Sequence, residues 1–211
     1  MQEISTHPYR RQLLNKSLLM SPKPIWEAPS EAVLYGKGPQ KLPGPWQLML
    51  LGDGSPTRHL RLLTGHEVEI KLIAMEYEAT PNKGAPIETQ ELQPPLLRRQ
   101  VWLTCHSQTL AWAESWWNYQ EAEFHLKNKE QPIWKSLTQG RSELFREVDG
   151  LALVKADWLE SEFQQEGPFW SRHYRFFRNE RELTVIREVF SPQLEVWLGP
   201  TPRKELINSK Q

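Results

Sequence analysis

Two charged residues lie among apolar neighbours in stretches whose alternation is typical of β-strands. Arg99 shares a strand face with Val101 and Leu103, and Glu188 shares one with Phe190, because side chains alternate between the two faces of a strand. A buried guanidinium is a planar, permanently charged donor for a carboxylate. A buried carboxyl needs a partner or takes up a proton. The two residues are therefore the first candidates for a functional site.

Two plainer interpretations of these charges stay open. Arg99 and Glu188 could pair with each other across a sheet, since structural ion pairs are common. The strand faces that carry them could also be solvent-exposed edges. Arg187 lies on the other side of its strand, with Val185 and Val189, so the same segment presents charge to both faces.

The stretch LGDGSPTRHLRLLTG adds a second candidate for anion binding. Ser55 is a suitable N-cap, Pro56 suits the first helical position, and Gly65 suits the C-terminal cap of a short helix. The first turn of a helix presents main-chain N–H groups and the positive end of the helix dipole. Three basic residues follow this helix start: Arg58, His59 and Arg61. An ordinary capped surface helix is the alternative.

Metal, nucleophilic and nucleotide chemistry find little support in the sequence. Six histidines show no ligand spacing such as HExxH, so we expect no metal site. Cys105 and His106 are neighbours on a strand and point to opposite faces, which predicts a buried thiol beside an exposed imidazole. The GxSxG, P-loop and GxGxxG motifs are absent. A single cysteine excludes an internal disulfide framework, and no cofactor is expected.

Length and charge narrow the class of protein further. The chain has 211 residues with 26 basic and 26 acidic side chains, so it lacks the basic excess of a nucleic-acid-binding protein. It contains no apolar run long enough for a signal peptide or a membrane span. We expect a cytoplasmic protein that forms one domain over residues 1–211. Residues 1–44 are predicted to be an irregular, proline-rich lead-in, and residues 193–211 an irregular tail.

The pattern of elements favours an α+β fold with an antiparallel sheet flanked by helices, because the strands come as hairpins. Helices are predicted over 46–51, 56–64, 119–129, 134–137 and 156–167, and a half-buried strand over 66–79. A loop covers 80–95. Hairpins are predicted over 96–118, turning at Ser107-Gln108, and over 171–190, turning at Asn179-Glu180. The chain between 138 and 150 is predicted to be irregular, and a short edge strand opens the tail at 194–198.

Four stretches in this order make the sequence resemble the chorismate lyase (chorismate–pyruvate lyase) family, in its cyanobacterial and plastid form. They are LLGDGSPTRHL, LRRQVWL with its hairpin partner, QPIWKSL, and GPFWSRHYRFFRNERELTVIREVFSP. The resemblance covers about residues 46–192. It implies an enclosed active site under two helical flaps, for which residues 46–65 and 119–145 are the candidates. The cavity would be sized for a small aromatic acid.

The reaction that the resemblance implies is removal of the enolpyruvyl side chain of chorismate, which gives 4-hydroxybenzoate and pyruvate without a cofactor or metal. The product would enter quinone biosynthesis, such as that of plastoquinone. The family's functional arginine falls on Arg99, which would anchor an anionic group and stabilise charge at the breaking ether bond. Its functional glutamate falls on Glu188, beside the ring hydroxyl. Its main-chain contacts to the ligand carboxylate fall near Pro56 and Ile133. Proline has no N–H, so either the first contact shifts to Thr57 or Pro56 contributes only shape.

Two rival functions remain at this stage. A non-catalytic domain of the same fold binds small-molecule effectors in some bacterial transcription regulators, but residues 1–44 are too short and proline-rich for the DNA-binding part. A structural or interaction protein would dock a partner through a tryptophan-rich surface and predicts exposed aromatic patches. Against it, Trp112, Trp116 and Trp117 are predicted to be core and sheet cover.

Overall fold

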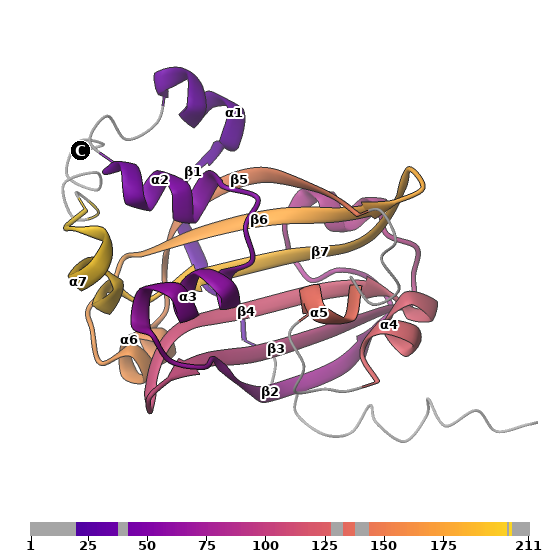
Figure 1. The fold of residues 1–211 in the computed structure, drawn as a ribbon. Coiled ribbons are helices and arrows are strands. Elements are labelled where there is room, and N and C mark those ends of the chain that lie inside the picture. Colours follow the sequence, from indigo (N-terminus) through magenta and orange to yellow (C-terminus); the bar gives the residue numbers. More distant parts are fainter. Residues whose placement is uncertain (1–19, 38–41, 128–132, 138–143, 202, 204–211) are drawn as a thin grey trace, which may run out of the picture.

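The computed structural model describes residues 20–37, 42–127, 133–137, 144–201 and 203. The strands of this part form one antiparallel sheet in the order β1-β5-β6-β7-β4-β3-β2 (Figure 1). They are β1 (Lys23–Pro29), β2 (Glu69–Glu78), β3 (Leu96–Cys105), β4 (Gln108–Asn118), β5 (Phe145–Lys155), β6 (Phe169–Arg178) and β7 (Arg181–Phe190). This sheet confirms the predicted antiparallel α+β class.

Short helices flank the sheet on both faces. The α-helices are α1 (Ser30–Ala32), α2 (Gly44–Leu51), α3 (Pro56–Thr64), α4 (Tyr119–His125), α5 (Ile133–Leu137), α6 (Asp157–Phe163) and α7 (Glu195–Leu198). A π-helical turn (Val33–Lys37) and the 3-10 helices η3 (Ile87–Glu91) and η4 (Pro192–Leu194) complete them. Figure 1 shows α3 and α5 lying over the same face of the sheet, which we name the α3 face.

The core on the α3 face is divided into two apolar clusters. One lies under α2 and α3, where Trp46 and Leu60 belong to the same buried cluster as Phe190 of β7. The other lies under α4 and α5, where Leu137 belongs to the same buried cluster as Tyr174 of β6. The boundary between the two clusters crosses the middle of the sheet, and we name it the seam. It holds a pocket lined by residues of both clusters, such as Leu103 and Phe176.

The opposite face, which we name the α6 face, is covered by α6 and by the loop before β3. Phe163 of α6 belongs to a buried cluster with Trp112, and Leu92 of the loop belongs to one with Trp116. Trp112, Trp116 and Trp117 are all fully buried. They are core residues, as predicted, so they form no exposed surface for a partner.

The lead-in contains a strand, which corrects its prediction as irregular. Two prolines, Pro24 and Pro29, hid β1 in the sequence, but the strand lies at the edge of the sheet, where proline is tolerated. The chain after α5 is also partly regular, because β5 begins at Phe145. Asp149-Gly150 reads as a turn, yet it lies at a bulge in β5, where the register with β6 shifts.

The beginning of the tail is helical, so the predicted edge strand at 194–198 is wrong. Ser191 caps this segment by accepting a hydrogen bond from the Gln193 N–H, and η4 and α7 follow. The turn of the first hairpin is His106-Ser107, one residue earlier than predicted, with both residues in the left-handed region at φ 47° and 65°. The second hairpin turns at Asn179-Glu180 as predicted. Residues 202 and 204–211 of the predicted tail lie outside the described residues.

Candidate active site

Arg99 lies on the central part of β3 and faces the seam under α3 and α5. Its side chain is buried, with only 2% of the residue exposed, and Val101 and Leu103 follow it along the same face. Burial lowers the pKa of Arg99 to about 10, because desolvation penalises the charged form. The guanidinium therefore remains charged at neutral pH.

Glu188 on β7 lines the same pocket and is 1% exposed. Its Oε2 accepts a hydrogen bond from Arg172 Nε at 2.8 Å, and its Oε1 accepts one from the Tyr174 hydroxyl at 2.7 Å. Strand β4 separates β7 from β3, and Ala113 of β4 pairs with Glu188. Arg172 is thus the ion-pair partner of Glu188, and the sequence-based alternative of a simple Arg99–Glu188 pair is wrong.

Tyr174 gives the carboxylate a neutral hydrogen-bond donor. Burial and the neighbouring Glu188 carboxylate raise the pKa of Tyr174, so its hydroxyl keeps its proton. With both oxygens in hydrogen bonds, the Glu188 carboxylate has a fixed orientation, and lone pairs remain for one further donor. The arrangement suits a group that accepts a hydrogen bond from a ligand hydroxyl.

The start of α3 lies at the pocket, as the sequence predicted. Ser55, Pro56 and Thr57 line it, and Ser55 stands at the N-cap position with its hydroxyl 2.9 Å from that of Thr57. Gly65 ends the helix in the left-handed conformation at φ 74°. Pro56 occupies the first helical position and offers no N–H, so the first main-chain donor of α3 is that of Thr57.

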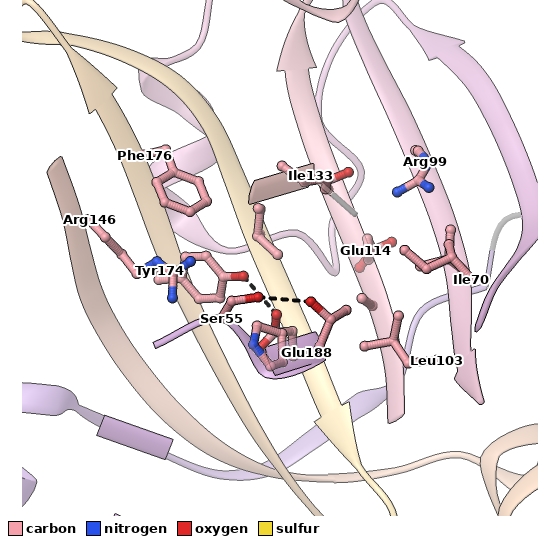
Figure 2. A pocket seen from close by; sticks show the side chains of 16 residues that line it. Ser55, Ile70, Arg99, Leu103, Glu114, Ile133, Arg146, Tyr174, Phe176 and Glu188 are labelled. Atoms are coloured by element: carbon pink, nitrogen blue, oxygen red, sulfur yellow. Dashed lines mark hydrogen bonds between the residues drawn. The ribbon is translucent and has the colours of Figure 1, made fainter. Parts of the chain in front are cut away.

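Ile133 begins α5 and lines the pocket from above the sheet (Figure 2). It packs against the apolar cluster under α4 and α5. The pocket is therefore covered by the N-terminal ends of α3 and α5, which belong to the two predicted flaps. Residues 128–132 and 138–143 of the second predicted flap lie outside the described residues.

Two arginines that the sequence analysis did not single out hold the turn between α2 and α3. Arg172 Nη1 donates to the main-chain oxygens of Met49 and Gly52, at 2.8 and 2.9 Å, and Nη2 donates to that of Gly54 at 3.2 Å. Arg146 Nη1 donates to the oxygens of Asp53 and Gly54 at 2.5 and 2.6 Å. The turn is thus bound to the sheet by guanidinium groups from β5 and β6.

The signal for these two residues differs. Arg172 lies opposite Glu188 in the pairing of β6 and β7, and it shares a strand face with Tyr174. A search for charged residues on apolar strand faces, which identified Arg99, would therefore also have found Arg172. Arg146 lies on β5, a strand that the sequence did not predict, so no alternation pointed to it. Tyr174 read as an ordinary strand aromatic.

The pocket between these walls is narrow. Its open space is about 40 Å³, well below the roughly 150 Å³ of a protein cavity that holds a benzene ring. The predicted cavity sized for an aromatic acid is therefore not preformed. A ligand with a six-membered ring requires the side chains or covering helices to move outward, which is possible because short elements cover the pocket.

A separate ion network occupies the α6 face. Glu114 of β4 accepts hydrogen bonds from Arg98 Nε at 2.6 Å and from Arg187 Nη2 at 2.5 Å, and both arginines are buried. Arg187 is on the face opposite Glu188, as its alternation predicted. This network ties β3, β4 and β7 together from behind and leaves the α3 face to the candidate site.

The described residues also bear on the predictions about the cysteine, metal binding and membrane spans. Cys105 is buried beside an exposed His106, as predicted. No group of three or more His, Cys, Asp or Glu side chains among the described residues is arranged to hold a metal ion. None of the helices in the described part has the length and apolar content needed to cross a lipid bilayer.

The fold and the site define an antiparallel α+β domain with a buried, arginine-rich pocket on one face of its sheet. Residues 50–198 match the family described as chorismate pyruvate-lyase Rv2949c-like, and the chain belongs to this family. It is 32% identical over 173 residues to the uncharacterized protein ycf21 of Cyanophora paradoxa, covering 82% of this chain and 90% of that protein.

A second relative and one solved structure are consistent with this assignment. The uncharacterized protein ycf21 of Porphyra purpurea is 33% identical over 165 residues, covering 77% of this chain and 88% of that protein. The effector domain of PhnF from Mycobacterium smegmatis superposes with a TM-score of 0.52 at 14% identity. The superposition covers 69% of this chain and 93% of that domain. At this identity, the likeness shows the fold alone.

Proposed function

We propose that this protein is a chorismate pyruvate-lyase, which converts chorismate to 4-hydroxybenzoate and pyruvate without a cofactor. Membership of the family supports the reaction. The observation that carries the proposal is that Arg99 and Glu188, far apart in the chain, are both buried and line one pocket. The proposed location is the cytoplasm, and the proposed fate of the product is quinone biosynthesis.

The substrate offers groups that match this pocket. Arg99 binds the ring carboxylate, and a charge-assisted hydrogen bond of this kind is strong in a dry site. In this proposal, main-chain groups at Thr57 and at the start of α5 near Ile133, which line the pocket, add contacts to the same carboxylate. Glu188 accepts a hydrogen bond from the ring hydroxyl at carbon 4, on the far side of the ring from the carboxylate.

The elimination needs no external reagent. The bond between ring carbon 3 and the ether oxygen breaks, the hydrogen on carbon 4 leaves as a proton, and the electron pair of that C–H bond completes the aromatic ring. Enolpyruvate leaves with the ether oxygen and gains a proton at its methylene carbon to become pyruvate. Aromatisation supplies the driving force, so the site contributes by orientation, fixed dipoles and exclusion of water.

A direct assay tests the proposal. Purified protein is mixed with chorismate, and 4-hydroxybenzoate is followed by its absorbance while pyruvate is measured with lactate dehydrogenase. The expected result is equimolar formation of both products at a rate proportional to enzyme concentration. A rate equal to that of chorismate alone would refute the lyase function.

A second function is favoured by one observation. The fold is shared with the effector domain of PhnF, so a non-catalytic domain that binds an aromatic acid is the alternative. It predicts that 4-hydroxybenzoate or chorismate raises the melting temperature without any turnover. Ligand-dependent stabilisation together with product formation identifies the enzyme instead.

A further inference from the structure

Arg146 is a cation of the pocket that the proposed reaction leaves without a role. Its guanidinium carbon lies 4.6 Å from the ring centre of Tyr174 and 4.5 Å from that of Phe176. Arg146 forms no ion pair with any carboxylate of the described residues. Of the two glutamates that line the pocket, Glu188 is paired with Arg172 at 2.8 Å, and Glu114 is paired with Arg98 and Arg187. The site therefore holds an additional positive charge.

The hydrogen bonds of Arg146 leave one edge of its guanidinium for a ligand. Both bonds, to the main-chain oxygens of Asp53 and Gly54, use Nη1. Its Nε is shielded from water and has no hydrogen-bond partner among the described residues. A buried N–H donor without an acceptor is costly, and the Nε–Nη2 edge of an arginine matches the two oxygens of a carboxylate.

We propose that Arg146 binds the second carboxylate of the substrate, that of the enolpyruvyl side chain; this inference rests on the proposed function. Figure 2 shows Arg99 and Arg146 on opposite sides of the pocket, with Tyr174 and Glu188 between them. Tyr174 connects the two positions, because its ring lies under Arg146 and its hydroxyl donates to Glu188.

The order of these groups matches the order of groups on chorismate. The ring carboxylate is at carbon 1, the hydroxyl is across the ring at carbon 4, and the side chain is attached at the adjacent carbon 3. With the ring carboxylate on Arg99 and the hydroxyl on Glu188, the side-chain carboxylate points toward Arg146. Arg146 then binds the carboxylate of the leaving group, and it distinguishes the dianionic substrate from a monoanionic product.

A comparison of two ligands tests this role independently of turnover. One is 4-hydroxybenzoate, which has one carboxylate. The other is 3-(carboxymethoxy)-4-hydroxybenzoate, an unreactive aromatic compound with a second carboxylate at the position of the side chain. Calorimetry gives the dissociation constant of each for the wild type, Arg146→Met and Arg146→Lys. Arg181→Met serves as the control, because Arg181 is exposed at the start of β7.

We expect Arg146→Met to weaken the dicarboxylate by about 10- to 100-fold, the range for a lost charge-assisted hydrogen bond. Its effect on 4-hydroxybenzoate should be at most about threefold. Arg146→Lys keeps the positive charge but lacks the planar edge, so its dissociation constant for the dicarboxylate should lie between those of the wild type and Arg146→Met. Substitution of Arg146 also removes its hydrogen bonds to the turn at Asp53, and a loosened turn would weaken the binding of both ligands alike. The ratio of the two dissociation constants is therefore the readout. An unchanged ratio in Arg146→Met overturns the inference.

The result also separates this inference from the proposed function. If chorismate is not converted but the ratio changes as expected, the carboxylate subsite stands and the lyase function fails. If chorismate is converted and the ratio does not change, the subsite fails and the lyase function stands.

Discussion

Glu188 is held by Arg172 and Tyr174, and this fixes what the residue can do. Removing the negative charge would leave Arg172 buried without its counter-charge, which is among the more destabilising changes a core tolerates. A carboxylate held by two hydrogen bonds keeps a fixed direction, so it serves better as a fixed acceptor than as a mobile base. The chemistry of the pocket therefore depends on placement of the ring hydroxyl.

Replacing Arg99 tests the anion-binding role at the residue scale. Arg99→Ala should lower kcat/KM for chorismate by about a thousandfold or more, because the bound carboxylate loses its charge-assisted hydrogen bonds in a dry site. It should also weaken binding of 4-hydroxybenzoate. Steady-state kinetics and calorimetry check both effects, with Arg181→Ala as the exposed control. Wild-type kinetics in Arg99→Ala would remove this residue from the site.

Glu188→Gln tests the acceptor role with little change in shape. The amide keeps an oxygen for one donor but loses the charge, so kcat should fall by about two orders of magnitude. Tyr174→Phe, which removes only the hydroxyl that orients Glu188, should lower kcat by about tenfold. Rates are compared at equal folded fractions, measured by circular dichroism. An effect of Tyr174→Phe larger than that of Glu188→Gln would contradict these roles.

The sequence identified Arg99 and Glu188 because both interrupt apolar strand faces in segments with clear alternation. It did not identify their partners. Hydrogen bonds from Arg172 and Arg146 to main-chain oxygens carry no sequence pattern, since any residue supplies a carbonyl. The partner of a buried charge is decided by which strands are neighbours, and strand order is a property of the whole sheet.

At the scale of elements, the turn between α2 and α3 is the feature that shapes the site. Arg172 and Arg146 bind its carbonyl oxygens, and the ring of His59 packs directly against Gly54. Burial, reinforced by Arg172, lowers the pKa of His59, so its imidazole is neutral at neutral pH. The turn is held close to the sheet without adding a further charge to the pocket.

Gly54→Ala tests how tightly this turn is packed. A Cβ at position 54 would lie 2.1 Å from His59 Nε2, so the ring or the turn must shift. Overpacking of this kind costs about 1–3 kcal/mol, which thermal unfolding would show as a melting temperature several degrees lower. Gly44→Ala is the matched control, because a Cβ at Gly44 meets nothing within 4 Å. Equal melting temperatures for the two variants would contradict this description.

The strand β5, which the sequence did not predict, is interrupted in its pattern by a glycine. Gly150 in β5 reads as a turn residue, yet a Cβ there would lie 2.5 Å from the His173 ring and 3.2 Å from the Ala28 oxygen. The glycine allows two neighbouring strands to approach, which only the assembled sheet reveals. By contrast, the hairpins over β3–β4 and β6–β7 are local, so alternation and turn residues were enough to predict them.

At the scale of the whole molecule, the sheet separates two electrostatic environments. Its α3 face carries the candidate site, and its α6 face carries structural ion pairs such as Arg175–Asp149. Glu182 also lies in this second environment, and burial raises its pKa to about 7. Neither of its carboxylate oxygens has a hydrogen-bond partner among the described residues.

Glu182 predicts a specific pH dependence of stability. The unfolded chain releases this proton near pH 4.5, whereas the folded chain keeps it until about pH 7. Stability therefore falls as pH rises through this window, and the full penalty is present above it. Because the group is only half-buried, we expect Glu182→Gln to raise the free energy of unfolding at pH 8 by about 1 kcal/mol. At pH 4.5 the effect should be near zero.

Urea unfolding at several pH values measures this difference. Glu180→Gln, in the exposed turn beside Glu182, is the control and should leave the pH profile unchanged. A stabilisation by Glu182→Gln that is the same at pH 4.5 and pH 8 would show that removal of the carboxyl proton equilibrium is not its cause.

The hydrogen bonds that hold the α2–α3 turn also affect which substitutions this region tolerates. Arg146 and Arg172 donate only to main-chain oxygens of the turn, so these contacts do not depend on which side chain stands at position 53. Substitutions at this position should be widely tolerated, and only the geometry of the peptide groups is under constraint. The turn can thus change the side chain it presents at position 53 while its attachment to the sheet persists.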